Sequence, residues 1–221
     1  MERENRDAIG FKPIDMETWE RREHFAYYTD ILETSYHMNV DVEITSFYNW
    51  TRENKYRFFP SFLYVIMTAV NRNKEFRMAY RNGILGFYNQ CHPSYTIFHK
   101  DDCTFSDIWS EYDPDFYKFY ENCIQDMERY KDIKGVKTKP GRPDNFCPVS
   151  CAPWVTFTGF GHDTPGTSKM YFPVINFGKF YEKEGKRYIP LSVYVNHAAA
   201  DGYHTSKLIL DIQNIVDEMG S

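Results

Sequence analysis

A histidine and an aspartate stand four positions apart in the stretch VYVNHAAADGYH, which covers residues 193–204. Imidazole is the side chain whose ordinary pKa lies nearest neutrality, so His197 is a candidate general base. It follows an apolar alternating segment and, by the two-residue period of a strand, shares a face with Val193 and Val195. Burial there favours the neutral ring that a base needs. A hydrogen-bonded core histidine fits the same pattern, and the residues alone leave both interpretations open.

The aspartate of this stretch, Asp201, is followed by Gly202, whose backbone freedom lets the chain leave the strand and begin a helix. Three structural roles compete with a catalytic one: a helix cap, an acceptor for a turn amide, and the partner of a buried arginine. We expect a structural role for Asp201 even if His197 is the base.

The composition is typical of one folded unit, and we expect residues 1–221 to form a single domain because no Gly-, Ser- or Pro-rich linker divides them. Phenylalanine and tyrosine number 18 each, enough aromatic material to line an apolar pocket. The net charge of -5 comes without a block of Lys or Arg, so we expect no nucleic-acid partner.

Neither a membrane span nor a metal site is predicted. The longest apolar run, residues 62–70, is too short to cross a bilayer, and the charged start MERENRDAIG is unlike a signal peptide, so we expect a cytoplasmic protein. The 5 cysteines are scattered without a CxxC pair, which argues against disulfides and zinc. Cys147 and Cys151 are interpreted as structural, with a catalytic thiol as the alternative.

Hydrophobic periodicity predicts an α+β fold, a two-layer sandwich of a mixed sheet packed with helices, because no βαβ repeat or GxGxxG turn is present. Asp15 can cap the first of these helices, and Pro60 stands at a plausible first helical position of the second. A turn containing Pro93 suggests a hairpin of residues 84–89 with 95–100. The predicted helices span residues 15–28, 60–73, 113–130 and 202–219. The predicted strands lie within residues 41–50, 84–89, 95–100, 148–160, 171–181 and 187–199, and a surface loop covers residues 131–145.

Several stretches carry a resemblance to a known family. NHAAADGYH resembles the HHxxxDG signature of chloramphenicol acetyltransferases and of the acyltransferase cores of 2-oxo acid dehydrogenase complexes. WERREHF, FRMAY, YTIFHKDDCTFSDIWSEY, VSCAPWVTFTGF and PVINFGKF are similar to chloramphenicol acetyltransferases specifically, in matching order over nearly the full length. The resemblance implies the CoA-dependent acyltransferase fold and acetyl-CoA as co-substrate. It also implies direct acetyl transfer to the primary (3-) hydroxyl of chloramphenicol in a ternary complex.

The resemblance also assigns roles to individual residues. His197 matches the family's base, which takes the proton of the acceptor hydroxyl, and Ser150 matches the residue that hydrogen-bonds the oxyanion of the tetrahedral intermediate. Asp201 is expected to pair with Arg21, in a structural ion pair that holds the histidine in place.

The substrate positions come from the same resemblance, as does a homotrimer whose active sites lie at subunit interfaces. There the histidine of one chain faces the acceptor pocket of its neighbour. Trp154 and Lys179 fall in segments that match the CoA side. The residues that match the apolar acceptor pocket are Tyr28, Leu32, Tyr36 and Phe105.

Three positions depart from the family pattern. Asn196 replaces the first histidine of the signature, and Asn176 stands where threonine usually helps to hold a water near the oxyanion. Tyr36 stands where phenylalanine is common. The alternatives are therefore the same machinery with another small alcohol or thiol acceptor, or a degenerate member that binds CoA or a drug with little turnover. A dehydrogenase-complex core is disfavoured because the chain lacks a lipoyl domain.

Overall fold

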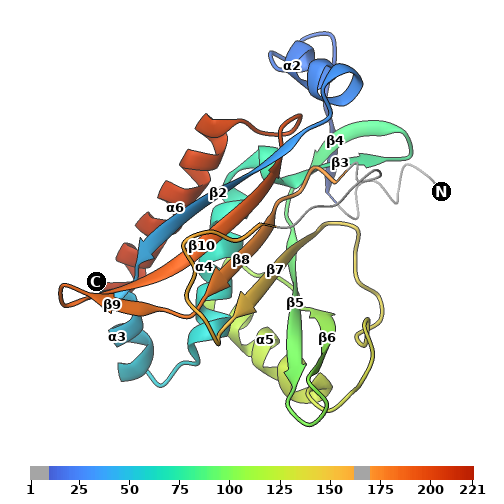
Figure 1. Ribbon diagram of the computed structural model, residues 1–221. Helices are drawn as coiled ribbons and strands as arrows, with labels where there is room; N and C mark the ends of the chain where they lie inside the picture. The colour runs from blue at the N-terminus through green and yellow to red at the C-terminus, as the bar shows by residue number, and fades with distance from the viewer. Residues whose placement is uncertain (1–9, 162–169) are drawn as a thin grey trace.

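The computed structural model, which describes residues 10–161 and 170–221, consists of a large sheet with helices against one of its faces (Figure 1). Hydrogen bonding orders this sheet as β2-β10-β8-β7-β5-β6, and β9 pairs with the start of β10. The β5–β7 and β7–β8 pairs are parallel and the others antiparallel, so the sheet is mixed, as predicted. The strands are β2 Ser35–Glu43, β5 His92–His99, β6 Thr104–Trp109, β7 Phe146–Ala152, β8 Val174–Gly178, β9 Tyr181–Lys183 and β10 Lys186–Asn196.

The hydrophobic core lies between the large sheet and the helices behind it. The α4 sequence is apolar nearly all round, and its Phe62 and Ile66 are fully buried. The α5 sequence is amphipathic and buries Phe119 and Cys123, while the side chain of Asp115 caps the helix by accepting from the Lys118 amide at 3.1 Å. The helices are α3 Thr45–Glu53, α4 Phe58–Arg72, α5 Phe116–Tyr130 and α6 Gly202–Gly220.

A smaller sheet, ordered β1-β4-β3, forms from β1 Phe11–Pro13, β3 Met78–Arg81 and β4 Ile84–Tyr88. Asn82 and Gly83 between β3 and β4 both have positive φ, 51° and 76°, as a tight two-residue hairpin turn requires.

The expected hairpin of residues 84–89 with 95–100 is therefore wrong. Pro93 lies inside β5, which pairs with β6 and β7 instead of β4. Aromatic and β-branched residues indicated that both segments are strands, but such residues do not specify a partner.

Two further elements differ from the prediction. The first helix does not begin at Asp15, whose carboxylate instead closes a turn by accepting from the Glu17 amide at 3.0 Å. Helix α2 spans Arg22–Ala26 and continues as the π-helical segment η1, Tyr27–Ile31. Within residues 41–50 only the start, which belongs to β2, is a strand. Helix α3 begins at Thr45, and its buried residues Phe47 and Thr51 are four positions apart, as one face of a helix requires.

The remaining predicted elements are present. The helix expected at residues 60–73 begins two positions earlier, and α5 and α6 lie within the expected segments to within three residues. Residues 131–145 form the expected loop, and β7, β8 and β10 are the three expected later strands. In the parts of the chain that the structure describes, every helix is too short or too polar to cross a membrane.

The packing of α6 leads to a matched test of the core. Leu208 is fully buried, whereas Leu210, on the same helix, is 62% exposed. We expect Leu208→Ala to lower the free energy of unfolding by about 2–5 kcal/mol and Leu210→Ala to change it by about 0.5 kcal/mol or less. Urea denaturation of both variants measures this, and equal losses would contradict the packing described here.

Candidate active site

His197 lies directly after the end of β10, between two aromatic rings. Its backbone N–H donates to the carbonyl oxygen of Thr34 at 3.1 Å. The ring of Tyr28, from η1, stacks on the imidazole with centroids 3.9 Å apart and planes within 10°. The ring of Tyr36, from β2, meets it edge-on at 5.2 Å and 66°. Separate segments of the chain therefore fix the plane of the imidazole.

The two nitrogens of the His197 ring have different surroundings. Nδ1 is buried and has no hydrogen-bond partner among the described residues. The His197 side chain as a whole is partly exposed, and Nε2 is not among the described side-chain atoms that are buried without a hydrogen-bond partner. Nε2 is therefore the candidate nitrogen for proton transfer, the role that a general base or acid requires.

Asn196, at the first position of the signature, closes the turn after β10. Its side-chain oxygen accepts from the Ala198 amide at 2.9 Å, and its carbonyl oxygen accepts from the amides of Ala199 and Ala200 at 3.1 and 3.2 Å. An asparagine side chain suits this role because it can hydrogen-bond the backbone two residues further on. The departure from histidine thus has a structural use in this chain.

Arg21 and Asp201, which were expected to pair, form an ion pair of 2.6 Å between Nη1 and Oδ2. Arg21 directly precedes α2, and Asp201 directly precedes α6, so the pair connects the two segments that flank His197. Burial acts to raise the pKa of Asp201, but the hydrogen bond from Arg21 and the charge of His204 together lower it to about 2. The carboxylate is therefore ionised throughout the neutral range.

His204 belongs to the same cluster, although the sequence alone did not single it out. Asp201 Oδ1 caps α6 by accepting from the Tyr203 and His204 amides at 3.0 and 3.5 Å. His204 Nδ1 lies 2.8 Å from Asp201 Oδ1, and its Nε2 lies 4.0 Å from Glu75 Oε1. The available signal was the capping-box spacing, in which the third helical residue reaches back to the cap.

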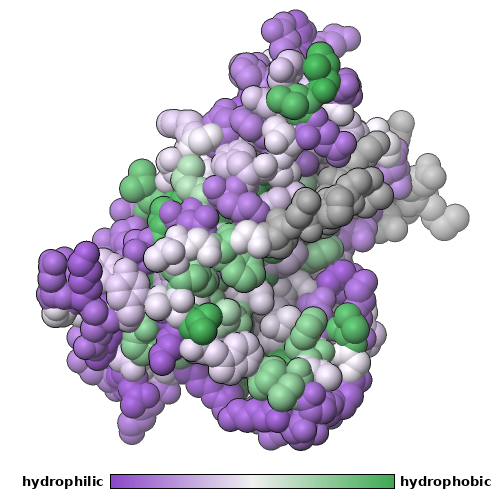
Figure 2. Space-filling view, in the orientation of Figure 1, coloured by the Kyte–Doolittle hydropathy of each residue, from purple (hydrophilic) through white to green (hydrophobic). Residues whose placement is uncertain are grey.

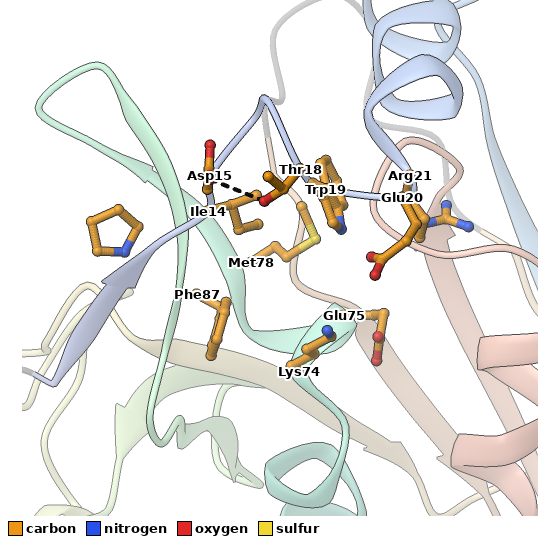
Figure 3. Close-up of a pocket in the computed structure, with 11 residues that line it drawn as sticks. Ile14, Asp15, Thr18, Trp19, Glu20, Arg21, Lys74, Glu75, Met78 and Phe87 are labelled. Atoms are coloured by element: carbon orange, nitrogen blue, oxygen red, sulfur yellow. Dashed lines mark hydrogen bonds between the residues drawn. The ribbon is translucent and has the colours of Figure 1, made fainter.

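A cavity of about 240 Å³ lies beside Arg21, between the segment before α2 and the segment before β3 (Figure 3). Its apolar lining includes Ile14, Trp19 and Met78. In Figure 3 the guanidinium of Arg21 points away from this cavity, which agrees with its bond to Asp201. Arg21 therefore serves the ion pair.

A second group of predicted residues lies on the large sheet. Ser150 in β7, Asn176 in β8 and Ser192 in β10 are register partners, so they form a polar row across three strands. Asn176 is only 8% exposed, and its Nδ2 has no hydrogen-bond partner among the described residues. A buried amide donor of this kind calls for a water or a ligand atom.

The sheet opens next to Ser150. The β5–β7 pairing ends at Tyr95 and Val149, whereas β7 continues beside β8 as far as Ala152. A cavity of about 830 Å³ lies at this opening, and Figure 2 shows apolar residues gathered around it over β5 and β6. Its lining includes the predicted residues Phe105, Ser150, Trp154 and Lys179, and also Phe58, Phe98, Phe177 and Phe180.

A neighbouring cavity of about 480 Å³ shares Phe58 and Phe180 with the larger one. Arg52, Lys55 and Arg57 contribute cations to its lining. These residues were missed from the sequence, although the stretch TRENKYR at residues 51–57 places three cations within seven positions. The cavity can receive the anionic end of a ligand whose apolar part occupies the larger one.

One chain does not bring the two groups together. Ser192 is level with Ser150 through the β8 register, and His197 lies five positions beyond Ser192, roughly 16 Å along a strand. Side chains alternate between the two faces of a sheet, so Ser192 and His197, five positions apart, belong to opposite faces. His197 continues the face of Val193 and Val195. The imidazole and the Ser150 hydroxyl of one chain therefore cannot act on the same atom.

Leu32, the remaining predicted residue, lies at the exposed end of η1. It is 49% exposed, and Tyr27 and Ile31 beside it are also exposed. This segment projects beyond the end of the large sheet (Figure 1), and apolar atoms are visible on it in Figure 2. An apolar tip of this kind is suited to contact with another molecule.

The cysteines near the large cavity are not activated. Burial raises the pKa of Cys151, which lines the cavity, to about 12, and raises that of the fully buried Cys147 well above its ordinary value. Neither thiol is a thiolate near neutral pH, so the catalytic-thiol alternative fails. Within residues 10–161 and 170–221, no group of three or more His, Cys, Asp or Glu side chains could hold a metal ion.

Comparison with known proteins identifies the family. The family described as "Chloramphenicol acetyltransferase" matches residues 9–213. The chain belongs to the chloramphenicol acetyltransferase family. It is 38% identical to the chloramphenicol acetyltransferase of Clostridium perfringens, covering 93% of this chain and 94% of that protein. It is also 38% identical to the one from Vibrio anguillarum, covering 95% of each.

Solved structures agree with this assignment at the level of the fold. A chloramphenicol acetyltransferase structure superposes with a TM-score of 0.82 at 22% identity, covering 93% of this chain and 99% of that one. Dihydrolipoamide acetyltransferase of Azotobacter vinelandii superposes with a TM-score of 0.66 at 11% identity, covering 83% and 81%. The fold is thus the α+β sandwich of the CoA-dependent acyltransferases, as expected from the sequence.

Membership of the chloramphenicol acetyltransferase family makes this protein an acyltransferase that uses acetyl-CoA as co-substrate. The signature residues of the family fall in the two groups described above. His197, Asp201 and Arg21 lie at the end of β10, and Ser150 and Asn176 lie on the sheet. The residues that the sequence matched to the family's functional positions therefore lie in two separate parts of one chain.

The ion pair of Arg21 with Asp201 has an expected pH dependence. The pKa of Asp201 is about 2 in the folded chain against an ordinary value of 3.8, so its carboxylate stabilises the fold above pH 3.8. That contribution is lost as the pH falls through 3.8 toward 2. We expect the free energy of unfolding of Asp201→Asn to fall less steeply over this range than that of the wild type, in urea titrations at several pH values. Equal slopes would show that the pair does not contribute.

Proposed function

We propose that this protein transfers the acetyl group of acetyl-CoA to the primary (3-) hydroxyl of chloramphenicol, directly, in a ternary complex of both substrates. The observation that carries the proposal is the imidazole of His197, which lies between two aromatic rings on a partly exposed side chain. The choice of acceptor is supported by the relatives from Clostridium perfringens and Vibrio anguillarum, both of which are named chloramphenicol acetyltransferases.

His197 is the general base of the proposed reaction. Its Nε2 takes the proton of the acceptor hydroxyl while the oxygen attacks the thioester carbonyl of acetyl-CoA. The tetrahedral intermediate then collapses, the C–S bond breaks, and the departing CoA thiolate receives the proton from the imidazolium. The products are the acetyl ester and free CoA thiol. The stacked ring of Tyr28 and the edge of Tyr36 keep Nε2 aligned during both proton transfers.

Ser150 is the proposed oxyanion donor rather than a nucleophile, because it lies on a strand and not in a GxSxG elbow. Its register neighbour Asn176 has a buried Nδ2 without a protein partner, and this amide can hold a water near the same oxygen. The amide thus replaces the hydroxyl that threonine supplies elsewhere in the family.

Acetyl-CoA occupies the large cavity in this proposal. The apolar opening between β5 and β7 suits the pantetheine arm and leads past Ser150, with Trp154 and Lys179 at its side. The adjoining cavity with Arg52 and Lys55 suits the phosphates of the nucleotide. The two cavities share Phe58 and Phe180 in their linings, so they are adjacent, as one long ligand requires.

We further propose that each active site is shared by two chains of a homotrimer. Because His197 and Ser150 of one chain lie roughly 16 Å apart along the sheet, the base must meet the serine of a neighbour. The acceptor pocket is then composite, with Tyr28, Leu32 and Tyr36 from one chain and Phe105 from the other. The exposed apolar tip at Leu32 is covered by that neighbour.

The proposed reaction is tested by thiol release from acetyl-CoA with and without chloramphenicol. We expect release that depends on the drug, reduced about 10²–10⁴-fold in kcat by His197→Ala and about 10²–10³-fold by Ser150→Ala. Leu210→Ala, at an exposed position of α6 away from both groups, is the control for protein handling.

Other outcomes separate the alternatives. Thiol release with a different small alcohol or thiol, but not with chloramphenicol, would identify another acceptor for the same machinery. Binding of CoA or the drug without release by folded protein would identify a degenerate member. A full rate in His197→Ala would overturn the assignment of the base.

The shared site predicts that two inactive variants restore each other. In trimers assembled from equal amounts of His197→Ala and Ser150→Ala chains, half of the chains carry the histidine and half carry the serine. A site that draws the two from different chains is then complete in about a quarter of cases. We expect about a quarter of the wild-type rate after co-refolding. Recovery of no activity would show that one chain supplies both residues.

A further inference from the structure

The hydroxyl of Tyr36 is engaged within the chain, although the ring faces His197. The hydroxyl lies 2.6 Å from Thr205 Oγ1 and 3.4 Å from the carbonyl oxygen of Ala200. Thr205 Oγ1 itself donates to the carbonyl oxygen of Asp201 at 3.1 Å. Since Thr205 uses its proton on Asp201, the Tyr36 hydroxyl is the donor in the shorter bond.

These bonds connect three parts of the site. Tyr36 lies opposite Val195 in the β2–β10 register, two positions before His197. Thr205, on the first turn of α6, is fully buried, and Asp201 caps the same turn. The Tyr36 ring, which contacts the imidazole edge-on, is therefore hydrogen-bonded to the first turn of α6. That turn is capped by Asp201, the partner of Arg21.

We infer that Tyr36 is a positioning residue for His197, acting through its hydroxyl bond to Thr205 rather than through the acceptor. This inference rests on the proposed role of His197 as base. Without the hydrogen bond between Tyr36 and Thr205, the Tyr36 ring and the first turn of α6 can move independently. The imidazole of His197 then loses one of the two aromatic rings that fix its orientation. Burial raises the pKa of Tyr36, so the hydroxyl keeps its proton and remains a donor across the neutral range.

The inference narrows the role expected for Tyr36 in the acceptor pocket. Tyr36 is partly buried, and its polar atom is turned to α6, so only the ring can touch an acceptor. Loss of the hydroxyl should therefore act on the rate of the chemical step and not on the binding of either substrate.

The test removes either end of the bond. We expect Tyr36→Phe and Thr205→Val each to lower kcat about tenfold, with the KM values for chloramphenicol and acetyl-CoA within about twofold of wild type. The double variant should be no slower than either single variant, because both remove one interaction. Thr205→Ser, which keeps the hydroxyl, should recover most of the rate lost in Thr205→Val.

Tyr112→Phe is the matched control. It removes a hydroxyl that lies 3.1 Å from Thr68 Oγ1 on a buried ring, which packs against Tyr64 and Phe119 and not against His197. We expect it to lower stability without lowering kcat. A loss of kcat equal to that of Tyr36→Phe would mean that general loosening of the chain explains the effect.

Two results would overturn the inference. A raised KM for chloramphenicol in Tyr36→Phe but not in Thr205→Val would mean that the hydroxyl contacts the acceptor. If the double variant lost kcat by the product of the two single losses, the hydrogen bond between Tyr36 and Thr205 would not be the cause of either loss.

A readout without substrate separates this inference from the proposed function. The ring signals of His197 in the NMR spectrum of histidine-labelled protein should shift or broaden in Tyr36→Phe and Thr205→Val, but not in Tyr112→Phe. An unchanged His197 signal would contradict positioning. A wild-type protein that leaves chloramphenicol unmodified would count against the proposed function alone.

Discussion

The ion pair of Arg21 with Asp201 is the interaction on which the arrangement of the site depends. It links the segment that leads into α2 with the turn that leads from β10 into α6, and both segments contribute to the surroundings of His197. Asp201 also caps α6 and contacts His204, so one carboxylate satisfies a guanidinium, backbone amides and an imidazole. Removing either charge would leave the other partly buried and uncompensated, at a cost well above that of a surface pair.

The second constraint is the geometry of the sheet. Strand alternation and register hold Ser150 and Asn176 on one face and at one level, while His197 continues the other face beyond the end of β10. The same sheet creates the opening beside Ser150, because β5 leaves β7 after Tyr95 and aromatic side chains line the gap. The sheet thus borders a large apolar cavity, and it separates His197 from Ser150 within one chain.

The positions that depart from the family pattern have polar uses in this chain. Asn196 hydrogen-bonds the turn after β10, and Asn176 presents a buried amide donor beside Ser150. Tyr36 bonds to Thr205 on α6. Each replacement satisfies or offers a hydrogen bond at a place where an unpaired polar group would be costly. Arg21, Asp201, His197 and Ser150 are all present beside them, so the proposed site keeps its main residues while the replacements alter local hydrogen bonding.

The sequence by itself determined the family, the fold class, most of the later elements and the Arg21–Asp201 pairing, because these depend on motifs, periodicity and matched signature residues. Only the tertiary structure decided that β4 pairs with β3 and not with β5, that α2 begins after Arg21, and that Thr205 joins the site. Propensity describes a residue's own backbone, whereas strand partners, ring stacking and hydrogen bonds between residues more than a hundred positions apart are set by packing. For the same reason, the separation of His197 from Ser150 follows from register and could not be read from the spacing of the two motifs.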